Sequence, residues 1–177
     1  MITEVEKKLG GFHKQAPSAI SRALNRAVTT VNSNVKKEVR KEYNIKAKDV
    51  SETLQKTRAN KSDLRASVTS KGSPVGLDKF KVSPKTINPN RKSPIKIGVK
   101  KSSLTKVMGA FVTDINGSKV FKRSGKSRLP VERLFGPSVP QMLGNENVVQ
   151  VIEEKGQETF QKRLEHEIGR ILKKGSG

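Results

Sequence analysis

Two stretches of helical spacing lie near the two ends of this chain and leave a middle that follows another pattern. Apolar residues recur at steps of three and four between residues 16 and 43: Ile20, Leu24, Ala27, Val31, Val35 and Val39. The same spacing returns between residues 145 and 174: Val148, Ile152, Gly156, Phe160, Leu164, Ile168 and Leu172. Such spacing gives a helix one apolar stripe. We therefore expect two long amphipathic helices that bury their stripes against a sheet or a neighbouring subunit.

The middle of the chain has strand and turn signals. A short second helix is expected over 47–58, and from residue 60 the apolar period becomes two. Residues 95–101 also alternate, which predicts that Lys96, Gly98 and Lys100 face outward together. Residues 109–115 and 119–123 flank Asn116-Gly117, a pair typical of tight hairpin turns. The pattern predicts an α+β fold, with both long helices packed on a four- to five-stranded antiparallel sheet.

We expect a single domain over residues 1–177, because a chain of this length is ordinarily one domain. Its parts are a helical N-terminal part (1–60), a basic antiparallel sheet (61–128), a proline-rich apolar loop (129–144) and a C-terminal helix (145–174). The charged N-terminus has no apolar core of a signal peptide, and no apolar run is long enough for a membrane span. We therefore expect no membrane partner.

Residues 129–142 combine prolines with apolar side chains, and we expect no regular structure there. An apolar loop is costly to leave in water, so it either closes the protein's own core or docks on a partner. Both uses remain open from the sequence. The candidate docking residues are Leu129, Pro130, Leu134, Phe135, Gly136, Pro137 and Val139.

The positive charge is concentrated rather than spread. The chain carries a formal net charge of +21, and residues 61–128 hold 17 Lys and Arg against 3 Asp and Glu. Residues 129–177 hold 7 of each sign. A field of this kind attracts polyanions such as nucleic acid, or an acidic protein surface. The candidate contact residues are Arg91, Lys92, Lys96, Lys100, Lys101, Lys119, Lys122, Lys126 and Arg128.

Three uses of these cations stay open: a solvated face without a ligand, a contact to the DNA backbone, and a contact to an acidic protein. Lys119, Phe121 and Arg123 are expected on one face of the hairpin, with Val120 and Lys122 on the other. Arg123 would then lie partly inward or along an interface. Sequence-specific DNA reading is not expected, because no helix carries a recognisable DNA-binding motif.

The sequence offers little catalytic or cofactor chemistry. There is no cysteine, and the only histidines are His13 and His166. Gly125-Lys126-Ser127 ends like a phosphate loop, but Val120 stands where that motif needs its first glycine. The aspartates show no spacing typical of a carboxylate pair or metal site. We expect no enzyme activity, no cofactor and no metal site.

Residues 120–142, VFKRSGKSRLPVERLFGPSVPQM, resemble the segment typical of the phage minor tail protein Z family. The resemblance extends to the N-terminal helix, to YNIKAKDV at residues 43–50 and to the C-terminal helix, in the same order. The family comprises tail-completion proteins of long-tailed phages and prophages. The resemblance implies a structural virion protein that completes the head-proximal end of the tail so that it can join the head.

The resemblance also implies partners and a place of action. These are the tail terminator or tube proteins, the tape-measure protein and further copies of the chain, in the virion and, during assembly, in the host cytoplasm. Double-stranded DNA, contacted through its backbone only, is a further candidate partner. The alternative function from another class is a free, non-specific DNA-binding accessory protein outside the virion. The presence of the chain in purified tails would discriminate between them.

Overall fold

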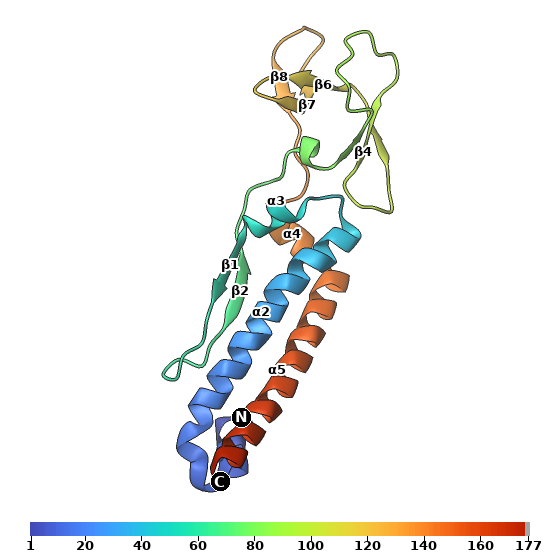
Figure 1. Ribbon diagram of the computed structural model, residues 1–177. Coiled ribbons are helices and arrows are strands. Elements are labelled where there is room, and N and C mark those ends of the chain that lie inside the picture. The colour runs from blue at the N-terminus through green and yellow to red at the C-terminus, as the bar shows by residue number, and fades with distance from the viewer. Residues whose placement is uncertain (176–177) are drawn as a thin grey trace. The chain divides into compact units, whose positions relative to one another are not determined.

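Helices and short strands share the chain in the computed structural model, which describes residues 1–175 (Figure 1). The α-helices are α1 (Ile2–Leu9), α2 (Ala16–Glu42), α3 (Ala47–Ser51), α4 (Val139–Leu143) and α5 (Glu146–Gly175). Single 3₁₀ turns occupy Gly10–Gln15 and Leu77–Lys79. The strands are β1 (Leu54–Thr57), β2 (Ser67–Ser70), β3 (Lys81–Ser83), β4 (Ile95–Gly98), β5 (Thr105–Val107), β6 (Ala110–Asp114), β7 (Ser118–Arg123) and β8 (Val131–Arg133).

The chain divides into two compact units, which are described separately. Within the described residues, unit 1 comprises residues 1–35, 54–70 and 149–175, and unit 2 comprises Lys36–Thr53 and Lys71–Val148. Both long helices expected from the sequence are confirmed, because α2 covers 16–42 and α5 covers 146–175. No helix within residues 1–175 is long and apolar enough to cross a membrane.

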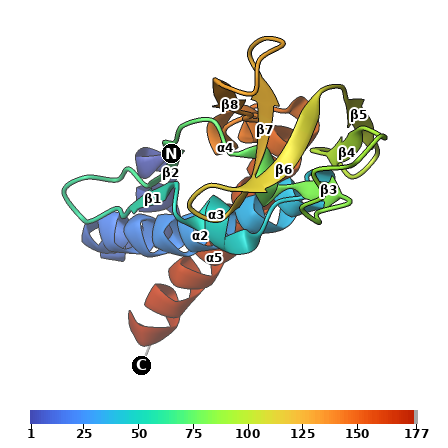
Figure 2. The same cartoon turned by 90° about the horizontal axis from the view of Figure 1, so that it is seen from above.

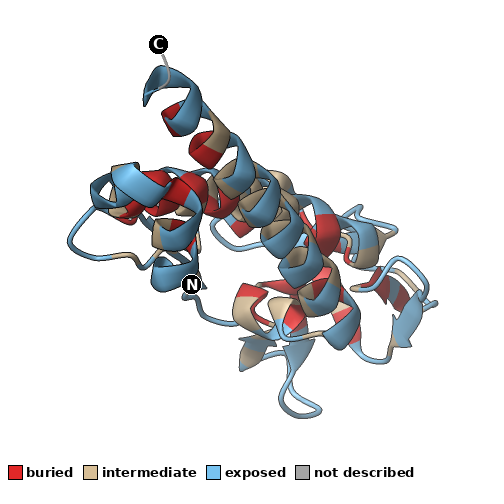
Figure 3. Ribbon diagram, turned by 90° about the horizontal axis from the view of Figure 1, so that it is seen from below, coloured by how far each residue is buried: buried red, intermediate tan, exposed pale blue. Residues whose placement is uncertain are grey.

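Unit 1 is built around the apolar faces of helices. Its core joins α1, the start of α2 and the end of α5 through buried side chains that include Val5, Leu9, Ile20 and Ile168. Figure 3 colours buried residues red and shows them on the helices as well as on the strands. Leu64, from the chain between β1 and β2, packs against the same cluster. The apolar stripes of α2 and α5 therefore meet one another in unit 1, where the sequence had predicted a sheet or a neighbouring subunit.

Gly156 is a point of close contact between the two long helices in unit 1. A Cβ atom added at this residue would lie 2.8 Å from Cγ2 of Val31, closer than carbon atoms pack. The hydrogen of glycine therefore lets α5 lie directly against α2. Neighbouring positions of the stripe on α5 carry larger side chains, so this contact is particular to one residue.

Glu167 is a fully buried carboxylate on α5, and three arginines converge on it. Its Oε2 lies 3.2 Å from Nη1 of Arg22 and 2.8 Å from Nη2 of Arg170. Its Oε1 lies 2.7 Å from Nη2 of Arg163, an ion pair whose angles are poor for a hydrogen bond. A buried carboxylate is costly unless it is paired, and here the pairing links α5 to α2.

Unit 2 contains two separate three-stranded antiparallel sheets, in the orders β3-β4-β5 and β6-β7-β8 (Figure 2). The third sheet of the protein, β1-β2, belongs to unit 1. The predicted single sheet of four or five strands is therefore wrong. Alternation along a strand fixes which face is buried but not which strand is its neighbour. The turn at Gly109 separates β5, in one sheet, from β6, in the other.

Two further expectations are corrected. The predicted helix over 47–58 ends at Ser51, and its second half is β1, which pairs with β2 in register Leu54↔Ser70 to Thr57↔Ser67. Cross-strand pairing outweighed helix propensity there. The proline-rich segment is not wholly irregular, because it contains β8 and α4. Ser138 and Gln141 form a capping box that starts α4, with Pro140 in the first turn, where proline is tolerated.

The hairpin expected around Asn116-Gly117 is confirmed. β6 and β7 pair in register from Ala110↔Lys122 to Asp114↔Ser118. Asn116 and Gly117 have φ values of 53° and 94°, the left-handed region that such a turn requires. The backbone N–H of Gly117 donates to Oδ1 of Asp114 at 3.0 Å, which closes the turn.

We predict that Glu167→Gln lowers the free energy of unfolding by about 2–3 kcal/mol, because three arginines would then converge on a neutral group. The expected loss is at the lower end for a broken buried pair because the arginines are each partly exposed and can regain water. Urea unfolding followed by circular dichroism measures it. Glu165→Gln is the control, because Glu165 lies two residues earlier on the exposed side of α5. An equal loss in both variants would contradict the prediction.

Candidate interaction surfaces

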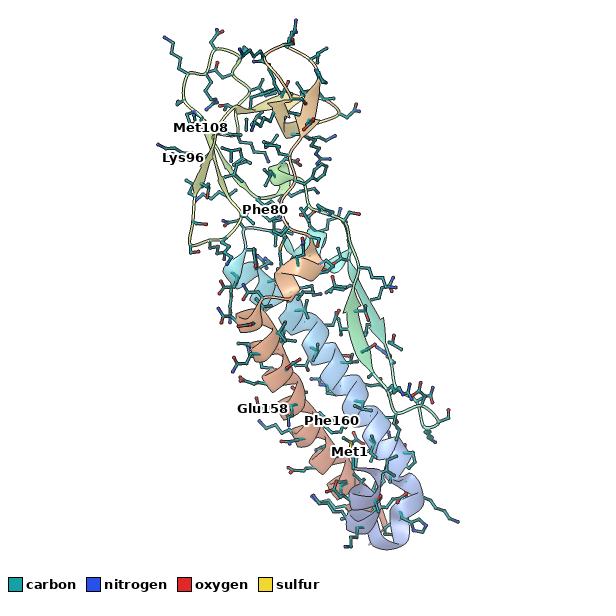
Figure 4. The ribbon with its side chains drawn as sticks, turned by 180° about the vertical axis from the view of Figure 1, so that it is seen from behind. Met1, Phe80, Lys96, Met108, Glu158 and Phe160 are labelled. Carbon is teal, nitrogen blue, oxygen red and sulfur yellow. The ribbon has the colours of Figure 1, made fainter. Side chains whose placement is uncertain are left out.

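The β3-β4-β5 sheet has one apolar face and one lysine face. Residues directly opposite one another in a sheet share a face, and the register pairs Lys96 with Ser83 and Lys106 and pairs Lys81 with Gly98. Lys81, Lys96 and Lys106 are all exposed, and we call them the lysine face. The opposite face carries Ile95 and Ile97, which are buried. Figure 4 labels Lys96 on this sheet.

Lys96 and Lys106 lie directly across from each other, an arrangement that is unfavourable without an anion between or above them. In residues 1–175, no lysine of this face forms an ion pair with a carboxylate. Lys81 and Lys106 were not among the predicted contact residues. The strand register that brings them beside Lys96 could not be read from the sequence.

Two carboxylates of unit 2, those of Asp78 and Asp49, form ion pairs with basic residues outside the lysine face. Asp78 pairs with Arg133 at 2.9 Å, and Asp49 pairs with Lys79 at 2.7 Å. The hydrogen bond from Lys79 and then the charge of Asp49 raise the pKa of Lys79 above its ordinary value of 10.5. These carboxylates therefore stabilise the framework and do not neutralise the lysine face.

The other predicted cations lie at several places in unit 2. Lys100 and Lys101 are exposed in the turn after β4, where their backbones hydrogen-bond to Asn44 and Glu42. Gly98, expected to face outward with them, is buried and packs close to the Asn44 side chain. That expectation was wrong. Gly98 shares a sheet face with Lys96, but residues 103 and 104 and the Asn44 side chain cover that face at Gly98, whereas Lys96 is exposed to water.

The hairpin faces agree with the predicted alternation. The register places Lys119, Phe121 and Arg123 on one face of β7 and Val120 and Lys122 on the other. The guanidinium of Arg123 lies 5.5 Å from the centre of the Phe111 ring, a cation–π distance. Lys126 and Arg128 are exposed in the loop between β7 and β8. The predicted cations thus do not all share one face.

The predicted docking residues divide into a buried group and an exposed group. Val139 is fully buried, whereas Leu129 and Phe135 are 68% and 53% exposed. Backbone hydrogen bonds hold the segment on both sides, from Leu134 to Val120 and from Leu77 to Leu134. The remaining members are Pro130, which is exposed, and Leu134, Gly136 and Pro137, which are half-buried.

A groove of about 710 Å³ lies along β6 in unit 2, between the 87–94 loop and residues 128–131. Four exposed apolar side chains line it: Ile87, Met108, Ile115 and Leu129. Four cations line it as well: Arg91, Lys92, Arg123 and Arg128. We call it the β6 groove. Only Arg91, Lys92, Arg128 and Leu129 were predicted site residues, because the others come together through long-range folding.

We predict that Val139→Asp and Phe135→Asp have very different effects on stability. Val139→Asp buries a charge in the core and should lower the free energy of unfolding by about 3–5 kcal/mol, or prevent folding. Phe135→Asp changes a half-exposed side chain and should cost less than about 1 kcal/mol. Thermal unfolding of both variants measures this. Equal losses would contradict the division into buried and exposed groups.

Comparisons with known proteins give one match. The family model described as Prophage minor tail protein Z (GPZ) matches residues 3–174. None of the curated proteins compared matches the chain, and no solved structure matches it. The match covers nearly the whole chain and includes residues of both units.

Proposed function

The chain belongs to the prophage minor tail protein Z family, and we propose that it completes the head-proximal end of a long phage tail so that the tail can join the head. A structural role in the phage tail is what membership of this family indicates. The match over residues 3–174 is the single observation that carries the proposal. The finer role at the head-proximal end rests on the tail-completion character of the resembling family.

The lysine face supports a contact to DNA in this role. Double-stranded DNA passes through the junction of head and tail, and its phosphates attract any array of unpaired lysines. The face has the property that such a contact needs, since Lys81, Lys96 and Lys106 gather on one side of a small rigid sheet. We propose that it contacts the DNA backbone without reading its sequence.

The exposed part of the proline-rich segment supports a contact to protein. Leu129 and Phe135 are large apolar side chains in water, and backbone hydrogen bonds hold the chain around Phe135 in place. A pre-ordered apolar surface loses little conformational entropy on binding. We propose tail terminator, tube or tape-measure proteins and further copies of this chain as partners, in the virion.

The direct test of the role is the composition and competence of phage particles. We expect the chain in purified tails, and we expect tails made without it to fail to join heads in an in-vitro joining assay. Added purified protein should restore joining. Absence of the chain from virions, together with normal joining in its absence, would overturn the proposal in favour of an accessory protein that acts outside the particle.

We predict that replacing Lys81, Lys96 and Lys106 together by Gln weakens binding to duplex DNA and makes it less salt-dependent. Each lost phosphate contact lowers the slope of log affinity against log salt by about 0.9, so the slope should fall by about 2–3. Fluorescence anisotropy with a labelled duplex measures it. The control replaces Lys7, Lys8 and Lys14 of unit 1, which are equally exposed. Equal slopes for both variants would contradict a role for the lysine face.

A further inference from the structure

The β6 groove gathers several large apolar side chains that are exposed to water. Nine large apolar side chains are exposed in residues 1–175, and four of them line this one groove. Met108 and Leu129 are 69% and 68% exposed. Single exposed apolar residues are ordinary, whereas a gathering of them marks a surface that another molecule covers. The distribution therefore indicates a ligand with apolar groups.

The groove also runs along an unpaired strand edge. β6 is at the end of its sheet order and, within residues 1–175, pairs only with β7. Six consecutive residues, 108–113, line the groove. Side chains of a strand alternate between its faces, so a consecutive run places the edge of β6 in the groove. Arg123 of β7 and Val131 of β8 share the face of Phe111 and extend the groove over that face. Along such an edge, alternate residues direct their N–H and C=O groups away from the sheet.

The charges around the groove are of one sign. Arg91, Arg123 and Arg128 line it with Lys92, and none of its lining residues in the described chain is acidic. Arg91 is held in place by hydrogen bonds from Nη2 to the backbone oxygen and Oγ1 of Thr86, at 3.0 and 3.1 Å. Arg123 is held over the ring of Phe111. The groove therefore offers ordered donors for carboxylates beside apolar contacts.

We propose that the β6 groove binds an extended, acidic and apolar segment of another protein, which adds to the sheet as a strand beside β6. The inference rests on the proposed function only for the source of the segment, which would be another protein of the tail or of the head–tail junction. Backbone hydrogen bonds to β6 supply affinity, and alternate side chains of the segment supply specificity. Its acidic residues pair with the arginines, and its apolar residues contact Met108 and Leu129.

The charge pattern excludes the two simplest other occupants. A second copy of this chain pairing β6 to β6 would bring eight groove cations together against only two carboxylates, one Asp114 at the end of each β6, which leaves net repulsion. DNA phosphates would be attracted to the arginines but would leave four apolar side chains uncovered. Only a ligand with both carboxylates and apolar groups on an extended backbone matches all three properties of the groove.

The test begins with selection of short random peptides on the immobilised full-length protein at physiological salt. We expect the selected peptides to alternate apolar residues with Asp or Glu, and to bind with dissociation constants of about 1–100 μM in fluorescence anisotropy. Methylation of the peptide backbone nitrogens, one at a time, should weaken binding at every second position, because only alternate N–H groups face β6. A flat response to methylation would overturn strand addition.

Variants of exposed residues locate the binding without disturbing the fold. Met108→Asp with Leu129→Asp should weaken binding of the selected peptide at least about tenfold, because both changes remove apolar contact and add repulsion. The matched control is Ile2→Asp with Leu104→Asp, which are exposed apolar residues outside the groove. Equal loss in both pairs, no loss in either, or no selected peptide would each overturn the proposal.

Two further outcomes separate this inference from others. Short duplex DNA that displaces the peptide, and whose own binding is lost in the Met108→Asp, Leu129→Asp variant, would show that the groove binds nucleic acid and would overturn the proposal. Peptide binding is measured on the isolated protein and does not depend on particles. The peptide-binding proposal can therefore hold even if the proposed role in the tail is wrong. Conversely, the chain can be present in tails and still bind no peptide in the β6 groove.

Discussion

Most carboxylates of the central segment form contacts within the fold. The two exposed surfaces of unit 2 are therefore strongly basic. Residues 61–128 contain only Asp63, Asp78 and Asp114, against 17 basic residues. Asp78 pairs with Arg133, and Asp114 closes the hairpin turn, so neither carboxylate neutralises the lysine face or lines the β6 groove. Anionic groups of a partner would supply charge balance at both surfaces.

The two surfaces have different physical character, although both are basic. The lysine face lies on the outward side of a thin sheet whose other side is apolar and buried, so it offers charge without apolar contact. The β6 groove combines charge with exposed apolar groups and a free strand edge. The proposed contacts to nucleic acid and to protein would therefore use different surfaces, because contact with phosphates is salt-dependent and contact with apolar groups depends mainly on burial.

The sequence predicted the elements better than their partners. The apolar stripes of α2 and α5 and the Asn116-Gly117 turn depend on local spacing, and all three were recovered. The partition into three small sheets depends on which strands meet, which alternation does not encode. The start of α4 was not predicted, although Ser138 and Gln141 have capping-box spacing, because the prolines of the segment argue against regular structure. The β6 groove was not predicted either. Ile87 and Met108 follow no pattern in the sequence that indicates a site, and only folding brings them beside Leu129.

Gly156 and Glu167 together fix the sliding register of α5 on α2 in unit 1. A slip by one turn moves a helix about 5.4 Å and replaces each residue by one three or four positions away. In one direction Arg163 would take the place of Glu167, and in the other Arg170 would, each facing Arg22. Ile152 or Phe160 would meet Val31, where only a hydrogen fits. Either neighbouring alignment would therefore raise the free energy of the folded state in two ways, through repulsion between arginines and through a steric clash at Val31.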